Sequence, residues 1–266
     1  MTASNPTATK RPSIEELRKV AQPDSVLGRV SGEHWAGRLY LRHVSIHLTR
    51  ALVPTRVTAD GLTAFLIVDG IAAALALTIP HWWAAVIAVV LIQVQGLVDC
   101  MDGELARWRQ RMGPIGIYLD RIAHYVTDAG LAVAVGAHAG GGLGHDNGWT
   151  TIGLCAGFVV LITKAETDLV HTSRALSGRP PTADTAAVAL PHAGVVRRLR
   201  RLAGNLPFNR ALLAMELTGL ALAASIIDAG RGGLAATRVL DIALLVIAGI
   251  VVVGHLLSIV TSDRLR

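Results

Sequence analysis

Charged side chains are scarce in this sequence. Asp, Glu, Lys and Arg make up 17% of its 266 residues, whereas 52% are hydrophobic, and the mean hydropathy is +0.49. A soluble domain ordinarily carries about a quarter charged residues. The composition therefore excludes an ordinary soluble globular protein and predicts a membrane protein.

Cysteine is also rare, with Cys100 and Cys155 falling in or beside different apolar segments. Two separated thiols provide neither a disulfide framework nor a zinc-binding pattern, so both are interpreted as packing residues. The first 20 residues lack the apolar core of a cleavable secretory signal. The first apolar span is therefore expected to direct membrane insertion.

Long apolar runs are what the sequence has in abundance. A helix needs roughly 20 residues to cross the hydrocarbon core of a bilayer. Six segments meet this requirement, at residues 62–79, 82–98, 114–138, 150–172, 211–229 and 236–260. The predicted fold is all-α, a polytopic membrane protein built as a bundle of six transmembrane helices.

An amphipathic segment precedes the first span. Residues 33–53 mix apolar groups with several arginines, which favours an amphipathic helix lying in the cytoplasmic interface. Residues farther upstream are polar, although Ser13 and Glu16 have the spacing of a capping box that opens a short helix. The predicted parts are a polar N-terminal segment at 1–30, a juxtamembrane helix at 31–56 and a six-helix domain at 57–262.

Basic residues are distributed unequally between the links. They gather before the first span, in the 99–113 link, between spans four and five and at the end, whereas the links at 80–81 and 139–148 have no Lys or Arg. By the positive-inside rule, both termini and the 99–113 link should be cytoplasmic. We expect an integral protein of the plasma membrane.

The formal net charge of the chain is +6. Because the basic residues flank membrane spans, anionic membrane lipids are the expected partner and nucleic acid is not. The strongest cluster lies in the 173–210 loop and consists of Arg197, Arg198, Arg200 and Arg201. It could face the inner leaflet or an anionic substrate, or provide topological charge alone.

Ionisable residues concentrate in LVDCMDGELARWRQRMGPIGIYLDRIAHYVTDAG, residues 97–130. On a helix, one set shares a face: Asp99, Asp102, Gly103 and Ala106. A second set follows at i, i+4 steps on the next helix: Gly116, Asp120, His124 and Asp128. The short basic link makes the two helices antiparallel neighbours, so the polar faces can meet.

Three converging carboxylates need a compensating cation, because they repel one another in a medium of low dielectric constant. Ligation by aspartate oxygens favours Mg²⁺ or Mn²⁺ with open positions for phosphate oxygens. Gly103 and Ala106 leave room for a bound group to approach the backbone, and Arg107 can pair with a phosphate. The motif therefore predicts a metal and phosphate site.

The stretch resembles the signature of the CDP-alcohol phosphatidyltransferase family, Asp-x2-Asp-Gly-x2-Ala-Arg-x8-Gly-x3-Asp-x3-Asp. Seven of its eight fixed positions match without a gap: Asp99, Asp102, Gly103, Ala106, Arg107, Gly116 and Asp120. A match of this length is highly specific. The resemblance covers about residues 50–260 and implies a six-helix membrane enzyme with a cytoplasmic site and a possible homodimer.

The activity that the resemblance implies is transfer of a substituted phosphate group from a CDP-linked alcohol, such as CDP-diacylglycerol, to an acceptor alcohol. CMP is released, and the pathway is phospholipid biosynthesis. Asp99, Asp102 and Asp120 would hold a pair of divalent ions. A second group would meet the cytidine and diphosphate of the donor: Gly103, Ala106, Arg107 and Gly116.

His124 is the departure from the signature, because the family places there an aspartate taken to be the base for the acceptor alcohol. Three hypotheses remain open. In the first, His124 is itself the base, since an imidazole suits accepting a hydroxyl proton near neutral pH and can also ligate a metal. Asp128, one turn further on, could be the base with His124 supporting a ligand. The site could instead bind nucleotide without turnover, as a scaffold.

A second, weaker resemblance lies in VTADGLT, residues 57–63, which is similar to the Thr-Pro-Asn-x-x-Thr element of the family. Thr58 and Thr63 match, whereas Ala59 and Asp60 do not. Asp60 is either the N-cap of the first span or a part of the site that needs a metal to approach phosphate.

Three charged residues in the fourth predicted span have two interpretations. Lys164, Glu166 and Asp168 could help to form the acceptor pocket, or could neutralise one another at i, i+2 and i, i+4 spacing. A membrane transporter with a cation pathway is the rival function, since carboxylates within a bundle also mark ion routes. The crowding of acids at one membrane face, without broken helices in repeated halves, argues against it.

Overall fold

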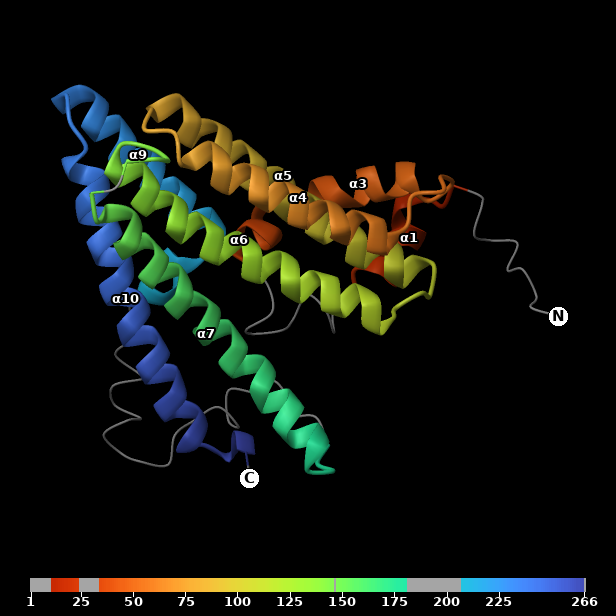
Figure 1. Ribbon diagram of the computed structural model, residues 1–266. Helices are drawn as coiled ribbons and strands as arrows, with labels where there is room; N and C mark the ends of the chain where they lie inside the picture. The colour runs from red at the N-terminus through yellow and green to blue at the C-terminus, as the bar shows by residue number, and fades with distance from the viewer. Residues whose placement is uncertain (1–10, 24–33, 146, 181–206, 266) are drawn as a thin grey trace. The chain divides into compact units, whose positions relative to one another are not determined.

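The computed structural model describes residues 11–23, 34–145, 147–180 and 207–265 (Figure 1). Every regular element within these ranges is helical, which confirms the all-α prediction for this part of the chain. The elements are α1 (Ile14–Ala21), the π-helix η2 (Gly37–Leu41), α3 (Arg42–Leu52), α4 (Ala59–Leu77), α5 (Trp82–Trp108), α6 (Pro114–Gly140), α7 (Trp149–Leu176), the 3-10 helix η3 (Pro207–Leu212), α9 (Ala214–Arg231), α10 (Ala235–Val260) and the 3-10 helix η4 (Asp263–Leu265).

Three of these helices, α4, α5 and α10, are long and apolar enough to cross a membrane. The other predicted spans coincide with α6, α7 and α9, which are also long helices but carry more polar residues. A membrane protein is therefore supported, and the count of six crossings stays a prediction. α5 extends well past the predicted end of its span at residue 98, so the first acidic face belongs to the same unbroken helix.

The N-terminal region contains the short helix that Ser13 and Glu16 predict. Ser13 accepts a hydrogen bond from the Glu16 backbone N–H, and the Glu16 carboxylate accepts one from the Ser13 N–H, which completes the capping box of α1. The amphipathic segment is helical as η2 and α3. Its location at a membrane interface stays a prediction, as do the boundaries at residues 30 and 56.

The chain divides into two compact units. The first comprises the described residues of Met1–Gly70 and of Gln93–His124. Its apolar core joins α1, α3 and the end of α5 and consists of Leu17, Ala21, Ile46, Val53 and Leu105. Arg109 closes the link after α3 by donating to the carbonyl oxygens of Leu52, Val53 and Thr55 at 3.3, 3.2 and 2.9 Å.

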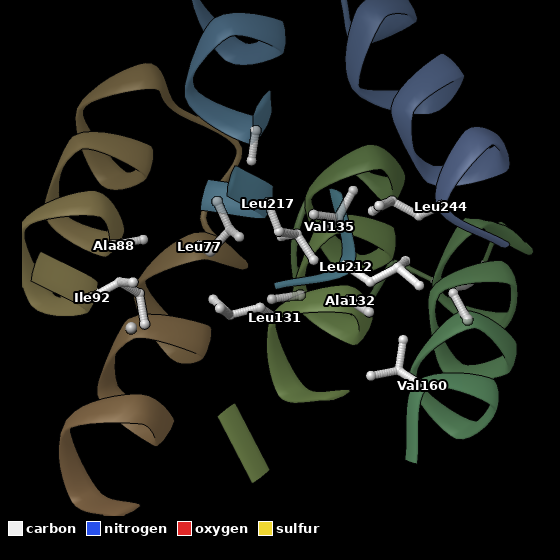
Figure 2. Close-up of a cluster of buried hydrophobic side chains, with 14 of the residues drawn as sticks. Leu77, Ala88, Ile92, Leu131, Ala132, Val135, Val160, Leu212, Leu217 and Leu244 are labelled. Carbon is white, nitrogen blue, oxygen red and sulfur yellow. The ribbon is translucent and has the colours of Figure 1, made fainter. Parts of the chain in front are cut away.

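The second unit comprises Ile71–Ile92 and the described residues of Tyr125–Arg266. Leucines, valines and alanines from several helices interlock in its core, as Figure 2 shows around Leu131, Val135 and Leu217. α7 and α10 run side by side (Figure 1). Gly136 of α6 and Gly153 of α7 let the backbones of their helices meet, since a Cβ on Gly153 would lie 2.8 Å from the Gly136 Cα.

Several predictions concern residues beyond the described ranges. The arginine cluster predicted to face anionic lipid lies outside the described residues, as does most of the 173–210 loop. Its assignment to lipid or substrate therefore stays a prediction.

Candidate metal and nucleotide site

Two helices of the first unit bring Asp99, Asp120 and His124 together. Each side chain offers a ligand atom within 4.8 Å of the other two. The Nε2 of His124 lies 3.6 Å from Oδ1 of Asp99 and 3.4 Å from Oδ1 of Asp120. All three side chains are between 38% and 46% exposed, so the cluster is open to solvent and to a ligand. The acidic faces of α5 and α6 therefore converge.

Asp102 belongs to the same region but has a different environment. It is buried, and its Oδ2 accepts a hydrogen bond of 2.7 Å from the Thr63 hydroxyl of α4. The charges of Asp99 and Asp120 both act on Asp102. Thr63, one of the two threonines of residues 57–63 that match the Thr-Pro-Asn-x-x-Thr element, thus orients one carboxylate of the motif.

This donor set fits a divalent cation. Two carboxylates and an imidazole present ligand atoms toward a common point, and a third carboxylate lies nearby. Carboxylate oxygens suit Mg²⁺ and Mn²⁺, and an imidazole is a common ligand of first-row transition metals. A cation there would also offset the repulsion among the acids.

Asp60 contacts Gly116 rather than capping its own helix. A Cβ on Gly116 would lie 3.0 Å from Oδ1 of Asp60, so a larger residue there would require this carboxylate to shift. The Gly61 N–H donates to the Thr58 hydroxyl at 3.0 Å. Thr58 is therefore the N-cap of α4, and the prediction that Asp60 fills this position is wrong. Thr58 directly precedes the first residue of α4, which is the N-cap position. Asp60 lies within the first turn, and its side chain faces α6.

Arg107 folds back over Gly103. A Cβ on Gly103 would lie 3.0 Å from Nη1 and 3.3 Å from Nη2 of this arginine. The Nε–H donates to the Ala21 carbonyl oxygen of α1 at 2.6 Å. Nη2 is buried without a hydrogen-bond partner among the described residues. Ala106, on the same helix, is half-buried.

The comparison with protein families decides the classification. The sequence model of the CDP-alcohol phosphatidyltransferase family matches residues 56–261, which is most of the chain. The chain belongs to this family. It is thereby placed among transferases that move a phosphate group from a CDP-alcohol and that use divalent metal. A comparison with curated proteins found no match.

Asp128, the second candidate for the base, is engaged elsewhere. It lies in the second unit, is buried, and forms an ion pair with Lys164 at 2.5 Å. Its other oxygen accepts a hydrogen bond from the Ala214 N–H at the start of α9. Both oxygens thus have partners within the second unit, and a role of Asp128 as the base stays a prediction.

The charged residues of α7 have partners on neighbouring helices. Lys164 contacts Asp128 of α6, whereas Glu166 contacts His255 of α10 at 2.9 Å. Asp168 accepts a hydrogen bond of 2.6 Å from the Tyr125 hydroxyl. These contacts join α7 to α6 and α10, and both interpretations of the three residues, an acceptor pocket and mutual neutralisation, stay predictions.

Glu104 is a residue of the site region that sequence reasoning missed. It occupies a variable position of the signature, yet its side chain has no exposed surface. Its carboxylate accepts hydrogen bonds from side chains of α3 and from Gln22, the residue directly after α1. The available signal was a carboxylate at i, i+3 spacing from Arg107, which places the two side chains on neighbouring positions of one helix face.

Proposed function

We propose that this protein transfers a substituted phosphate group from a CDP-linked alcohol to an acceptor alcohol and releases CMP. CDP-diacylglycerol or a similar lipid is the proposed donor, and phospholipid biosynthesis the proposed role. The observation that carries the proposal is the convergence of Asp99, Asp120 and His124 from two helices within the family signature.

Asp99, Asp102, Asp120 and His124 would hold Mg²⁺ or Mn²⁺, as a pair of ions. When bound, such ions neutralise charge on the diphosphate and on the departing CMP. The protein contributes the placement of these ligands: Thr63 fixes the orientation of Asp102, and Asp120 and His124 lie one helical turn apart on α6.

The proposed donor pocket lies on the Gly103 face of α5. Gly103 leaves room for the Arg107 guanidinium to lie over α5, Ala106 is a second small residue on this face, and the buried Nη2 of Arg107 needs an acceptor. A guanidinium pairs bidentately with phosphate oxygens, so Arg107 would orient the diphosphate. On α6, Gly116 leaves room for the Asp60 carboxylate beside this proposed pocket.

His124 is the proposed base. A neutral imidazole nitrogen would take the proton of the acceptor hydroxyl. The resulting oxygen attacks the β-phosphorus of the donor and forms a new P–O bond. The bond between this phosphorus and the bridging oxygen breaks, and CMP leaves with the electron pair. The product is a phosphodiester, and His124 returns its proton to solvent.

The second candidate function is a nucleotide-binding scaffold without turnover. His124 favours it, because this residue replaces the family's carboxylate and contacts both Asp99 and Asp120. An imidazole fully engaged as a ligand would leave the acceptor without a base. The two functions share the donor pocket and differ only in CMP release.

The proposed membrane arrangement has six crossings, with both termini and the site on the cytoplasmic side. Helix directions within the second unit support it. The contacts of Glu166 with His255 and of Arg174 with Arg264 show α7 and α10 running parallel, as alternate crossings must. Anionic lipids and a second copy of the chain are the proposed additional partners.

The test is CMP release by the purified protein in nanodiscs, with panels of CDP-alcohols and acceptor alcohols. Metal-dependent CMP formation, matched by a phosphodiester in mass spectrometry, is expected with Mg²⁺ or Mn²⁺. CDP binding without CMP from any pair would establish the scaffold. Metal-dependent ion flux with neither CDP binding nor CMP release would identify the transporter.

A further inference from the structure

The N-terminal helix α1 lies outside the residues that the family model matches, yet it contacts the signature. The Ala21 carbonyl oxygen, at the end of α1, accepts the Nε–H of Arg107 at 2.6 Å. Carbonyl groups at a helix C-terminus have no partners within their helix and carry partial negative charge. They therefore suit a guanidinium, and α1 directs this end at Arg107.

Glu104 holds α1 in place. The Gln22 side-chain amide, directly after α1, donates to Oε1 of Glu104 at 2.7 Å and to the Arg42 carbonyl oxygen at 2.9 Å. The remaining donors come from α3, where Ser45 and Thr49 donate to the two Glu104 oxygens at 2.6 and 2.7 Å. A fully buried carboxylate requires such donors, so Glu104 ties α1 and α3 to α5.

Apolar packing reinforces this attachment. Leu17 and Ala21 of α1 are fully buried in the core that includes Leu105, which directly follows Glu104. The opposite face of α1 is open: Lys19 and Glu15 form an exposed i, i+4 pair. α1 therefore has one packed face, which ends at Arg107, and one solvent face with no contact to the signature.

The consequence for Arg107 is a fixed orientation. A guanidinium has two edges for pairing with an anion, one with Nε and one formed by Nη1 and Nη2. Ala21 occupies Nε. The Nη1–Nη2 edge remains and lies over Gly103, with Nη2 buried and unpartnered among the described residues.

We infer that α1 is a positioning element for nucleotide binding, which holds Arg107 through the Ala21 carbonyl so that its Nη1–Nη2 edge faces a diphosphate at Gly103. This inference rests on the proposed function for the identity of the donor. It extends that function to a segment outside the residues that the family model matches and assigns Gln22 and Glu104 as positioning residues.

The test measures CDP affinity by isothermal titration calorimetry at saturating Mn²⁺, using the full chain in nanodiscs. Gln22→Leu removes one donor to Glu104 and loosens the end of α1. We expect about a tenfold weaker CDP affinity, with Mn²⁺ affinity unchanged because Asp99, Asp120 and His124 are not touched. Lys19→Ala, on the solvent face of the same helix, is the matched control and should bind CDP normally.

A double-mutant cycle separates positioning from general stability. Arg107→Ala should weaken CDP binding by itself, and Gln22→Leu should then add nothing, because the group that α1 orients is gone. Losses that multiply in the double variant would overturn the inference, as would a parallel loss of Mn²⁺ affinity in Gln22→Leu or unchanged CDP affinity in that variant.

A milder variant covers the case in which Gln22→Leu does not fold. Ser13→Ala removes the exposed cap of α1 and leaves its packed face intact, and we expect a two- to fivefold loss of CDP affinity that also disappears without Arg107. Unchanged affinity in this case overturns the inference. CDP binding without CMP release would refute only the transfer reaction, so the two failures are distinguishable.

Discussion

At the scale of single residues, His124 separates this chain from the family signature. Its Nε2 contacts Asp99 and Asp120 and is half-exposed, a position from which an imidazole can ligate a metal or accept a proton. Both roles use the same nitrogen. For each substitution at this residue, metal binding must therefore be measured together with enzymatic activity.

Removing a carboxylate from the cluster should remove the metal. We expect Asp120→Asn to abolish CMP release and to weaken Mn²⁺ binding at least tenfold, because an amide contributes no charge. Electron paramagnetic resonance titration measures the bound Mn²⁺. Glu15→Gln, an exposed carboxylate of α1, is the control and should retain both properties; equal Mn²⁺ affinity in Asp120→Asn would contradict the ligand assignment.

Changing His124 tests the base. His124→Ala should lower kcat by about 10²- to 10⁴-fold, whereas His124→Asp restores the family residue and should retain much of the activity. If His124 also ligates, electron spin-echo spectra of bound Mn²⁺ should show a nitrogen coupling that both variants lose. Near-normal kcat in His124→Ala would assign the base to another residue.

Asp128 should matter for stability and not for chemistry. Its buried ion pair with Lys164 predicts that Lys164→Met alone leaves an uncompensated charge and destabilises the protein by about 3–5 kcal/mol. Asp128→Asn should keep CMP release within tenfold of the wild type per folded enzyme. Thermal unfolding and activity of the same preparations provide the comparison, and a loss of 10² or more in Asp128→Asn would make it the base.

At the scale of helices, close backbone contact organises the second unit. Gly136 and Gly153 touch where α6 crosses α7, and a Cβ on Gly157 would lie 2.8 Å from the Ala129 carbonyl oxygen. Small residues at helix crossings allow such contact in membrane proteins. The apolar runs of the sequence predict both helices, but which glycines form the crossing depends on their relative rotation.

A methyl group added at this crossing should lower the stability of the protein. Gly153→Ala is expected to destabilise by about 1–3 kcal/mol, because the neighbour that it meets is backbone and cannot move aside. Gly249→Ala in α10 is the matched control: a Cβ there meets nothing within 4 Å, and loss of a helical glycine is stabilising by about 0.5–1 kcal/mol. Thermal unfolding in detergent compares them, and equal melting temperatures would refute the crossing.

At the scale of the whole molecule, membrane orientation is the property to measure. Leu143 and Met112 are exposed residues in links predicted to lie on opposite sides of the membrane. With Cys100 and Cys155 replaced by alanine, Leu143→Cys should react with an impermeant maleimide in intact cells. Met112→Cys should react only after permeabilisation, and the reverse pattern would invert the proposed topology.

The sequence alone determined the helices and the family. Apolar runs of sufficient length predict helices wherever they occur, since backbone hydrogen bonds must be satisfied within each segment. Helical periodicity also placed Asp99 and Asp120 each on a polar face of its helix. The short link makes the two helices antiparallel neighbours, so these faces can meet. The capping box of Ser13 followed from spacing over three residues. All of these are local properties.

Only the tertiary structure decided which side chains meet across long separations. Gln22 and Glu104 are 82 residues apart in sequence, and periodicity specifies the face of a residue without naming its partner. The same reason explains why Lys164 pairs with Asp128 and why Asp60 faces Gly116. A contact between distant segments depends on the packing of whole helices, and this packing is what brings α1 to Arg107.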